Sequence, residues 1–185
     1  MNGMAAAVSE KGYTTTTIAD IVRHARVSKR SFYENFTDKD ACLVACYVAM
    51  CERALQLVAQ VTASDLPEEQ QLEAVVHGFL SVIKLQPKFV RTLLLQIHEI
   101  GPRGWKVRHQ IHQRFEQIFI EQVSAGNPST RSKQIFSPNF AEVVIGGLGV
   151  SLLVATEHGG EKKLEEWSRT VIEFVRLCRG ISAKK

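Results

Sequence analysis

The chain has 185 residues, of which 45% are hydrophobic and 23% are charged, and its formal net charge is +4. Its glycine and proline contents are modest, so the composition excludes collagen-like, fibrous and intrinsically disordered proteins. No run of about 18 uninterrupted apolar residues is present, and no basic segment followed by a long apolar core opens the chain, so we expect neither a membrane-spanning helix nor a secretory signal. We therefore expect a cytoplasmic protein without a membrane partner.

The sequence predicts an all-α fold. Apolar residues recur at spacings of three and four, without a hairpin signal or a sustained alternation of polar and apolar residues. About nine helices are expected, in chain order over residues up to 11, 17–24, 28–35, 38–61, 68–86, 87–98, 103–124, 137–157 and 164–179. Residues 129–136 are expected to form a surface loop.

Several helix ends carry their own signals. Ser28 is a good N-cap for the third helix. Residues 37–40 fit a capping box, which predicts Thr37 as the N-cap of the fourth helix. Gly159 and Gly160 are expected to close the eighth helix.

The second and third helices, expected over 17–24 and 28–35, are short, amphipathic and joined by a tight turn. Phe32 and Phe36 lie four residues apart and give the third helix an aromatic inner face. This is the geometry of a helix-turn-helix motif, over about 17–36, whose second helix enters the major groove of DNA.

The outer face of the third helix carries side chains that can read bases, namely Lys29, Arg30, Ser31 and Asn35. Arginine pairs with guanine, asparagine with adenine, and serine with several base edges. Residues 23–30 hold four cations and no carboxylate, which favours a nearby phosphate backbone. A solvated helix face would explain the charges alone, but the joint pattern predicts double-stranded DNA as the partner.

A spaced set of residues lies within 12–47: Gly12-Tyr13, Thr16 or Thr17, Ile21-Val22, Ala25-Arg26-Val27-Ser28, Tyr33, Phe36 and Lys39. In this order and spacing they resemble the DNA-binding domain of the TetR (tetracycline repressor) family of bacterial regulators. The resemblance implies a three-helix DNA-binding domain over 1–47 and a larger helical effector-binding and dimerisation domain over 48–185.

The resemblance also implies roles for individual residues. Thr17, Tyr33 and Lys39 would bind phosphates, while Lys29, Arg30 and Ser31 would face bases. Ser28, Arg26 and Asn35 complete the expected DNA interface. It comprises Thr17, Arg26, Ser28, Lys29, Arg30, Ser31, Tyr33, Asn35 and Lys39.

The sequence departs from the family pattern in three places. Arg26 stands where the family usually has glycine, so either the turn stays right-handed or Arg26 is mildly strained, and its side chain adds a possible phosphate contact. Arg30 also replaces a frequent glycine, which would change the bases that are read. Only eleven residues precede Gly12 and the usual basic arm is missing, from which we expect a truncated chain or a misplaced start codon.

The C-terminal part offers a surface for a homodimer. Residues 140–155 are apolar nearly all round, and a helix of that kind needs to be buried on both sides. A second subunit is expected on one side, with an internal core helix as the alternative. The expected interface comprises Val143, Gly146, Gly147, Val150, Val154, Trp167, Val171, Phe174 and Val175.

A small-molecule effector is expected from the resemblance. Candidate lining residues of its pocket are Phe79, Phe89, Leu93, Trp105, Phe115 and Phe119, although core packing explains each of them equally well. His109 and His112 are spaced as a metal-binding pair but lack a third ligand, so we expect no metal and no cofactor.

The four cysteines do not form the framework of a disulfide-rich secreted domain. Cys42 and Cys46 share a face of the fourth helix, while no Cys-x2-Cys pair or nearby histidine gives zinc spacing. We expect buried free thiols, with a redox switch as the alternative.

Taken together, these features predict a homodimeric repressor that a small-molecule effector releases from its operator. An activator, and a ligand-binding helical protein that has lost sequence-specific DNA binding, are the alternatives. No nucleophile elbow, phosphate-binding glycine loop or paired-carboxylate signature stands out, so we expect no enzymatic activity.

Overall fold

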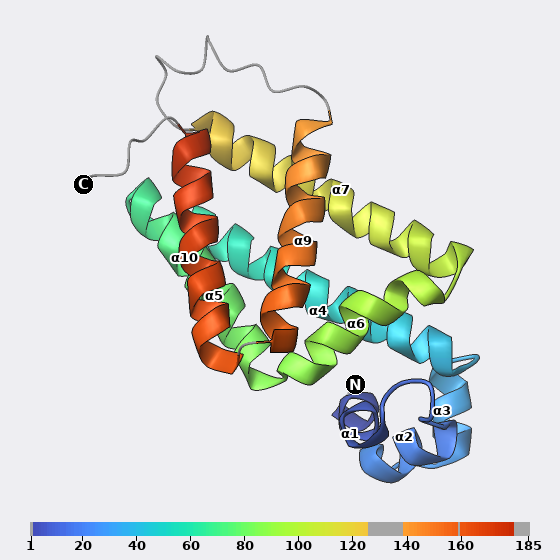
Figure 1. Cartoon of the computed structure of the whole chain (residues 1–185). Helices are drawn as coiled ribbons and strands as arrows, with labels where there is room; N and C mark the ends of the chain where they lie inside the picture. The colour runs from blue at the N-terminus through green and yellow to red at the C-terminus, as the bar shows by residue number, and fades with distance from the viewer. Residues whose placement is uncertain (1, 126–138, 159, 180–185) are drawn as a thin grey trace. The chain divides into compact units, whose positions relative to one another are not determined.

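The computed structural model describes residues 2–125, 139–158 and 160–179 of the chain (Figure 1). This part of the chain forms nine α-helices and no strand, which confirms the all-α prediction. The helices are α1 (Asn2–Lys11), α2 (Ile18–Ala25), α3 (Lys29–Asn35), α4 (Lys39–Thr62), α5 (Glu68–Leu85), α6 (Pro87–Glu99), α7 (Pro102–Ala125), α9 (Phe140–His158) and α10 (Gly160–Cys178). The predicted loop over 129–136 and the predicted helix start at 137 lie outside the described residues.

Most helix ends fall within two residues of the predicted positions, because the apolar spacing and the N-caps mark them. Ser28 caps α3 as expected, since its hydroxyl accepts a bond from Ser31 N at 3.0 Å. The helix that was expected to close at Gly159 and Gly160 ends at His158, directly before the pair, and residue 159 lies outside the described residues. Gly160 is the first residue of α10, with φ at +55°, a conformation that glycine adopts without a steric penalty.

The prediction that Thr37 caps α4 was wrong. Asp38 Oδ1 accepts a bond from Ala41 N at 2.6 Å, and the Asp38 carbonyl accepts the first bond of the helix, from Cys42 N. Asp38 is therefore the N-cap, and Thr37 Oγ1 instead donates to the Asp38 carboxylate at 2.9 Å. The bond from Ala41 is the main reason that the pKa of Asp38 lies below its usual value.

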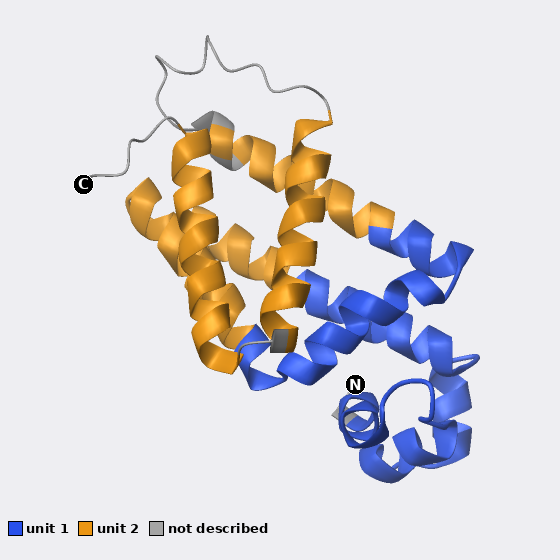
Figure 2. Ribbon diagram, viewed as in Figure 1, with its two compact units in different colours: residues 1–53, 83–108 blue, residues 54–82, 109–185 orange. Residues whose placement is uncertain are grey.

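The helices form two compact units (Figure 2). Unit 1 comprises residues 1–53 and 83–108, and unit 2 comprises residues 54–82 and 109–185. The fourth helix contributes to both units. The expected domain boundary between residues 47 and 48 stays a prediction.

Unit 1 contains α1 to α3, most of α4, α6 and the start of α7. Helix α1 packs closely on α2, because a Cβ atom added at Gly3 would lie 2.6 Å from Ala25 Cβ. Met4, Leu43 and Ile97 are almost completely buried and come from α1, α4 and α6 respectively. All three helices thus bury apolar side chains within unit 1, where α1 contacts both α2 and α6, and α2 contacts α3.

Unit 2 is held together by an apolar cluster with members from α5, α7, α9 and α10. Phe119 on α7 stacks on Phe174 of α10, with ring centroids 6.5 Å apart. Arg176 on α10 forms ion pairs with Glu69 and Glu73 of α5, the latter at 2.8 Å. These contacts fix α10 against α5 and α7.

Two helices, α4 and α9, are long and apolar enough to cross a membrane when judged by length and composition alone. The core helix of a soluble protein passes the same test. Cys42, Leu43 and Cys46 of α4 are buried in unit 1, which accounts for its apolar character. Helix α9 differs, because Val143, Val150 and Val154 are exposed.

Candidate nucleic-acid interface

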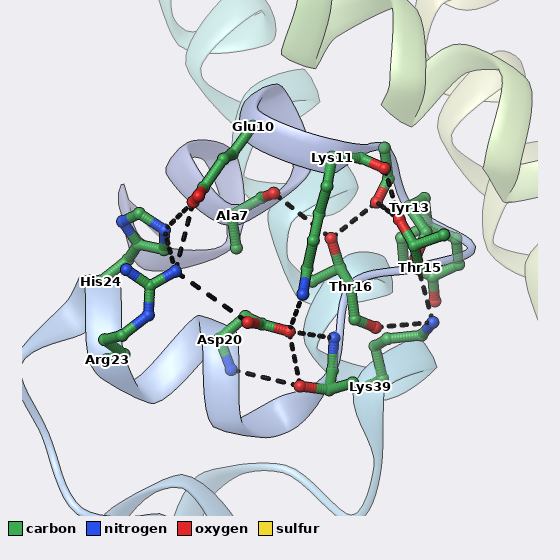
Figure 3. A network of polar contacts seen from close by, with 12 residues as sticks. Ala7, Glu10, Lys11, Tyr13, Thr15, Thr16, Asp20, Arg23, His24 and Lys39 are labelled. Atoms are coloured by element: carbon green, nitrogen blue, oxygen red, sulfur yellow. Dashed lines mark hydrogen bonds and ion pairs between the residues drawn. The ribbon is translucent and has the colours of Figure 1, made fainter.

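A lysine at the start of α4 holds the segment between α1 and α2. Lys39 Nζ donates to the carbonyl oxygens of Tyr13 and Thr16, at 3.0 Å each, and lies 4.3 Å from the centroid of the Tyr13 ring (Figure 3). The Tyr13 hydroxyl donates in turn to Asp40 Oδ1. Burial, followed by this bond, raises the pKa of Tyr13, so the hydroxyl stays protonated and remains a donor.

Asp20, in the first turn of α2, joins that helix to α1. Its carboxylate lies 2.6 Å from Lys11 Nζ and accepts a bond from Thr17 N at 2.8 Å (Figure 3). Thr17 Oγ1 accepts from Asp20 N and completes a capping box. Lys11, and then Thr17, lower the pKa of Asp20, so the carboxylate is ionised near neutral pH.

One cation of the basic segment, Arg23, pairs with a carboxylate of α1 while its side chain remains exposed. Arg23 Nη2 lies 3.2 Å from Glu10 Oε2, which also lies 2.7 Å from His24 Nε2 (Figure 3). The bonds from His24 and then Arg23 lower the pKa of Glu10. Because Arg23 and Glu10 are exposed, their ion pair adds little stability.

The turn between α2 and α3 is left-handed at Arg26, with φ at +56° and ψ at +41°. Val27 N donates to Val22 O and Arg26 N donates to Arg23 O, which is the Schellman pattern that normally uses glycine. The sequence left two outcomes open, a right-handed turn or a mildly strained Arg26, and the structure has the strained Arg26. The Arg26 side chain is exposed.

The inner face of α3 anchors the helix. Phe32 is only 4% exposed, and its ring centroid lies 5.6 Å from that of Tyr33 and 5.3 Å from that of Phe36. This arrangement confirms the predicted aromatic inner face. With Phe32 fixed in the core, the opposite side of α3 must face the solvent.

The outer face of α3 is open. Lys29, Arg30 and Asn35 are exposed, Tyr33 is 56% exposed, and Ser31 is half-buried. Four of the five groups thus lie fully on the surface of unit 1. Thr17, Arg26 and Ser28 are exposed as well.

Several of these polar groups already have partners within the chain. Arg30 Nε donates to Glu34 Oε1 at 3.1 Å, while its side chain remains 90% exposed. Asn35 Nδ2 donates to Ser31 O at 2.9 Å, which leaves its second amide hydrogen and its oxygen for a base. Lys39 uses two of its three N–H groups on backbone carbonyls, so at most one remains for a phosphate.

Sequence reasoning missed two contacts that shape the region. Tyr13 pairs with Asp40, and Arg103, at the start of α7, lies 3.7 Å from the Asp38 carboxylate. Each contact joins segments that are far apart in the chain, so helical periodicity gives no signal for it.

The six residues predicted to line an effector pocket divide between the two units. Phe89 and Leu93 are buried in unit 1, whereas Trp105 of the same unit is 53% exposed, beside His98 and Arg108. The other three belong to unit 2, where Phe119 is buried and Phe79 and Phe115 are half-buried. The pocket itself stays a prediction.

The residues predicted for the homodimer interface lie on α9 and α10 and differ in exposure. Val143, Val150, Val154 and Gly147 are exposed on α9, and Gly146 is half-buried. On α10, Val171 and Val175 are buried in the core of unit 2, while Trp167 and Phe174 are half-buried beside it. Only the α9 residues thus form an open apolar face.

Among the described residues, no group of three or more His, Cys, Asp or Glu side chains is placed to hold a metal ion. His109 is exposed and His112 is half-buried on α7. Nothing in this part of the chain adds a third ligand to that pair.

Solved structures with the same fold are transcriptional regulators. FadR from Bacillus subtilis, in complex with stearoyl-CoA, has a TM-score of 0.75 and 15% identity, over 94% of each chain. FadR from Bacillus halodurans has a TM-score of 0.71 and 13% sequence identity, over 94% of each chain. PfmR from Thermus thermophilus, a TetR family regulator, has a TM-score of 0.65 and 15% sequence identity, over 98% of each chain.

No curated protein sequence resembles the chain significantly. Residues 5–46 match the family model described as "Bacterial regulatory proteins, tetR family". The match covers α1 to α3 and the first turns of α4, which are the elements that present the outer face of α3. Residues 5–46 thus match the tetR family model, and the chain shares its fold over nearly its whole length with solved transcriptional regulators, PfmR of the TetR family among them.

Proposed function

We propose that the chain is a sequence-specific transcriptional regulator that inserts α3 into the major groove of double-stranded operator DNA. The observation that supports this proposal most directly is that α3 has a buried side and an exposed polar side. Phe32 is buried, whereas Lys29, Arg30 and Asn35 are exposed on the other side. A rigid helix with donors on its open face is what base readout requires.

The interface residues divide into two groups by chemistry. Arg30, Lys29 and Ser31 read base edges from the first turns of α3. Thr17 and Tyr33 bind phosphates from either side of that helix, and their hydroxyl groups fix the register of the protein on the duplex. Arg26 contacts a phosphate from the left-handed turn, while Lys39 acts mainly by holding the segment between α1 and α2.

We propose that the regulator is a homodimer that pairs through α9. Val143, Val150 and Val154 are spaced by seven and four residues and are exposed together on that helix. A Cβ atom added at Gly146 or Gly147 would meet no atom within 4 Å, so close approach of a second helix is open there. Two subunits would hold two α3 helices about one turn of DNA apart.

We further propose that a small-molecule effector releases the dimer from its operator, which makes the protein a repressor. FadR from Bacillus subtilis, which shares the fold, binds stearoyl-CoA. A long-chain acyl-CoA is therefore the first effector to test. Release requires only that the effector binds more tightly to an arrangement in which the two α3 helices do not fit the operator.

Selection of bound sequences from a random duplex pool tests the proposal. We expect two half-sites related by a two-fold axis, and an affinity that falls steeply as the salt concentration rises. Addition of stearoyl-CoA to the isolated complex then tests release. Equal affinity for all duplexes would contradict sequence-specific regulation and favour a ligand-binding protein that has lost DNA readout. Binding that increases with effector would favour an activator.

A further inference from the structure

Two thiols lie side by side on the helix that follows α3. Cys42 and Cys46 are free cysteines four residues apart on α4, so they share one face, and they are 3% and 2% exposed. Cys51, also buried, lies nine residues beyond Cys42, about two and a half turns along the helix, and therefore on the opposite face. The fourth cysteine, Cys178, belongs to α10.

The two thiols of the pair are chemically different. Interaction with the Cys46 thiol lowers the pKa of Cys42, although burial opposes the change. Interaction with Cys42, together with burial, raises the pKa of Cys46. Cys42 is therefore the thiol of the pair that loses its proton more readily, as expected of a reactive cysteine beside a resolving partner.

The intact helix cannot accommodate a bridge between them. Side chains four residues apart on a helix have Cβ atoms about 5–6 Å apart, whereas a disulfide needs a Cβ separation of about 3.5–4.5 Å. Closing the bond must therefore distort α4 between Cys42 and Cys46. That segment begins one residue after Ala41, whose N–H is held by the Asp38 cap.

We propose that Cys42 and Cys46 form a redox modification site, in which a peroxide converts the pair into an intrahelical disulfide that unwinds the start of α4 and weakens DNA binding. The regulatory part of this proposal rests on the proposed DNA-binding function. The start of α4 also carries Lys39, which holds the Tyr13 and Thr16 carbonyls. Unwinding would therefore disturb the support of α2 and α3.

The chemistry balances with the peroxide as the oxidant. The Cys42 thiolate attacks one peroxide oxygen, the O–O bond breaks, and the leaving hydroxide takes up a proton to give water and a sulfenic acid. The Cys46 thiol then attacks the Cys42 sulfur and displaces the hydroxyl, which leaves as a second water. The sulfur pair loses two electrons and the peroxide gains them. An external dithiol reverses the bond by exchange.

The burial of both sulfurs makes the reaction depend on local opening of unit 1. DNA that binds only the intact domain must then oppose oxidation, and oxidation must oppose DNA binding to the same extent. The proposal thus predicts protection of the thiols by operator DNA as well as release of DNA by peroxide.

Mass spectrometry of the full chain after peroxide treatment tests the site. We expect a loss of two hydrogens localised to the peptide that contains Cys42 and Cys46. Cys46→Ala should stop at a sulfenic acid on Cys42 that a dimedone probe traps, and Cys42→Ala should form neither product. The matched controls Cys51→Ala and Cys178→Ala should still form the bridge. Four thiols that remain open to alkylation after treatment, or a bridge between other cysteines, would overturn the proposal.

Binding to the selected operator tests the coupling. We expect the oxidised chain to bind about tenfold more weakly, within the range usual for coupled sites, and a dithiol to restore the affinity. Far-ultraviolet circular dichroism should show a small loss of helix on oxidation. An unchanged affinity in fully bridged protein would reject the regulatory role. A reduced protein that binds no operator would instead contradict the proposed function, while the mass data would still decide the chemistry of the pair.

Discussion

For single residues of this domain, the structural role can be separated from the proposed DNA-binding role. Arg26 is the clearest case, because its backbone is left-handed while its exposed side chain is a cation. The cost of this conformation for a residue with a Cβ atom is about 1 kcal/mol. The chain retains arginine there in spite of that cost, which is expected if the guanidinium contacts DNA.

Replacement of Arg26 separates the two roles. Arg26→Gly should raise the free energy of unfolding by about 1 kcal/mol, because glycine adopts the left-handed turn without strain. Arg26→Ala keeps the Cβ atom and should give no such gain. If the cation contacts a phosphate, both variants should lose DNA affinity equally and show a shallower salt dependence. Urea unfolding and titration with operator measure the two effects, and an affinity unchanged in both variants would remove Arg26 from the interface.

Arg30 tests base readout in the same way. Arg30→Ala should cost about 1–3 kcal/mol of binding free energy and relax the preference at one base pair of each half-site. Glu34→Gln is the control, because it removes the ion-pair partner of Arg30 but keeps the cation, and its binding should be equal or slightly tighter. Competition with single-base operator variants measures the profile. An unchanged profile in Arg30→Ala would contradict the role.

At the scale of elements, the placement of α2 and α3 depends on contacts with α1 and α4. Lys39 and Asp20 provide these contacts in unit 1, together with the capping residues of α2 and α4. The recognition helix has only seven residues, and a helix that short does not persist without packing. The order of α3 is therefore a property of the surrounding helices.

The cap of α4 provides a test at this scale. Asp38→Ala should lower the free energy of unfolding of unit 1 by about 1 kcal/mol, since it leaves Ala41 N without its acceptor. Thr37→Ala is the matched control and should cost less, because Thr37 bonds only to the Asp38 side chain. Chemical unfolding followed by helix signal measures both. An equal loss in the two variants would contradict the assignment of Asp38 as the N-cap.

Sequence reasoning predicted the helices and the inner face of α3 because both follow from local periodicity. It did not distinguish Thr37 from Asp38 as the cap, since either residue type caps well and the path of the chain decides. The inward orientation of Lys39 could not be foreseen, because its carbonyl acceptors are 23 and 26 residues away. Likewise, the spacing of Val171 and Val175 indicates burial but does not say whether core or partner covers them.

At the scale of the whole molecule, the exposed face of α9 is the feature that a single subunit leaves unexplained. Val143 is 71% exposed and Val150 is 61% exposed on a helix whose other side packs against α10 and the core of unit 2. Burial of such side chains against a second copy would contribute about 1.5–3 kcal/mol each. A dimer of this kind would set the distance between two α3 helices.

A single large side chain on that face tests the pairing. Gly147 is exposed and a Cβ atom there meets nothing within 4 Å, so Gly147→Leu should fold within its own subunit. Between two closely packed α9 helices the added leucine would overlap the partner, and we expect sedimentation to show monomers. Ala6→Leu, which adds a similar side chain at an exposed position of α1, should remain dimeric. The monomer should then bind a half-site weakly and lose the two-fold preference of the selected operator, because two recognition helices no longer bind as one unit. A dimer that survives Gly147→Leu would place the subunit interface elsewhere.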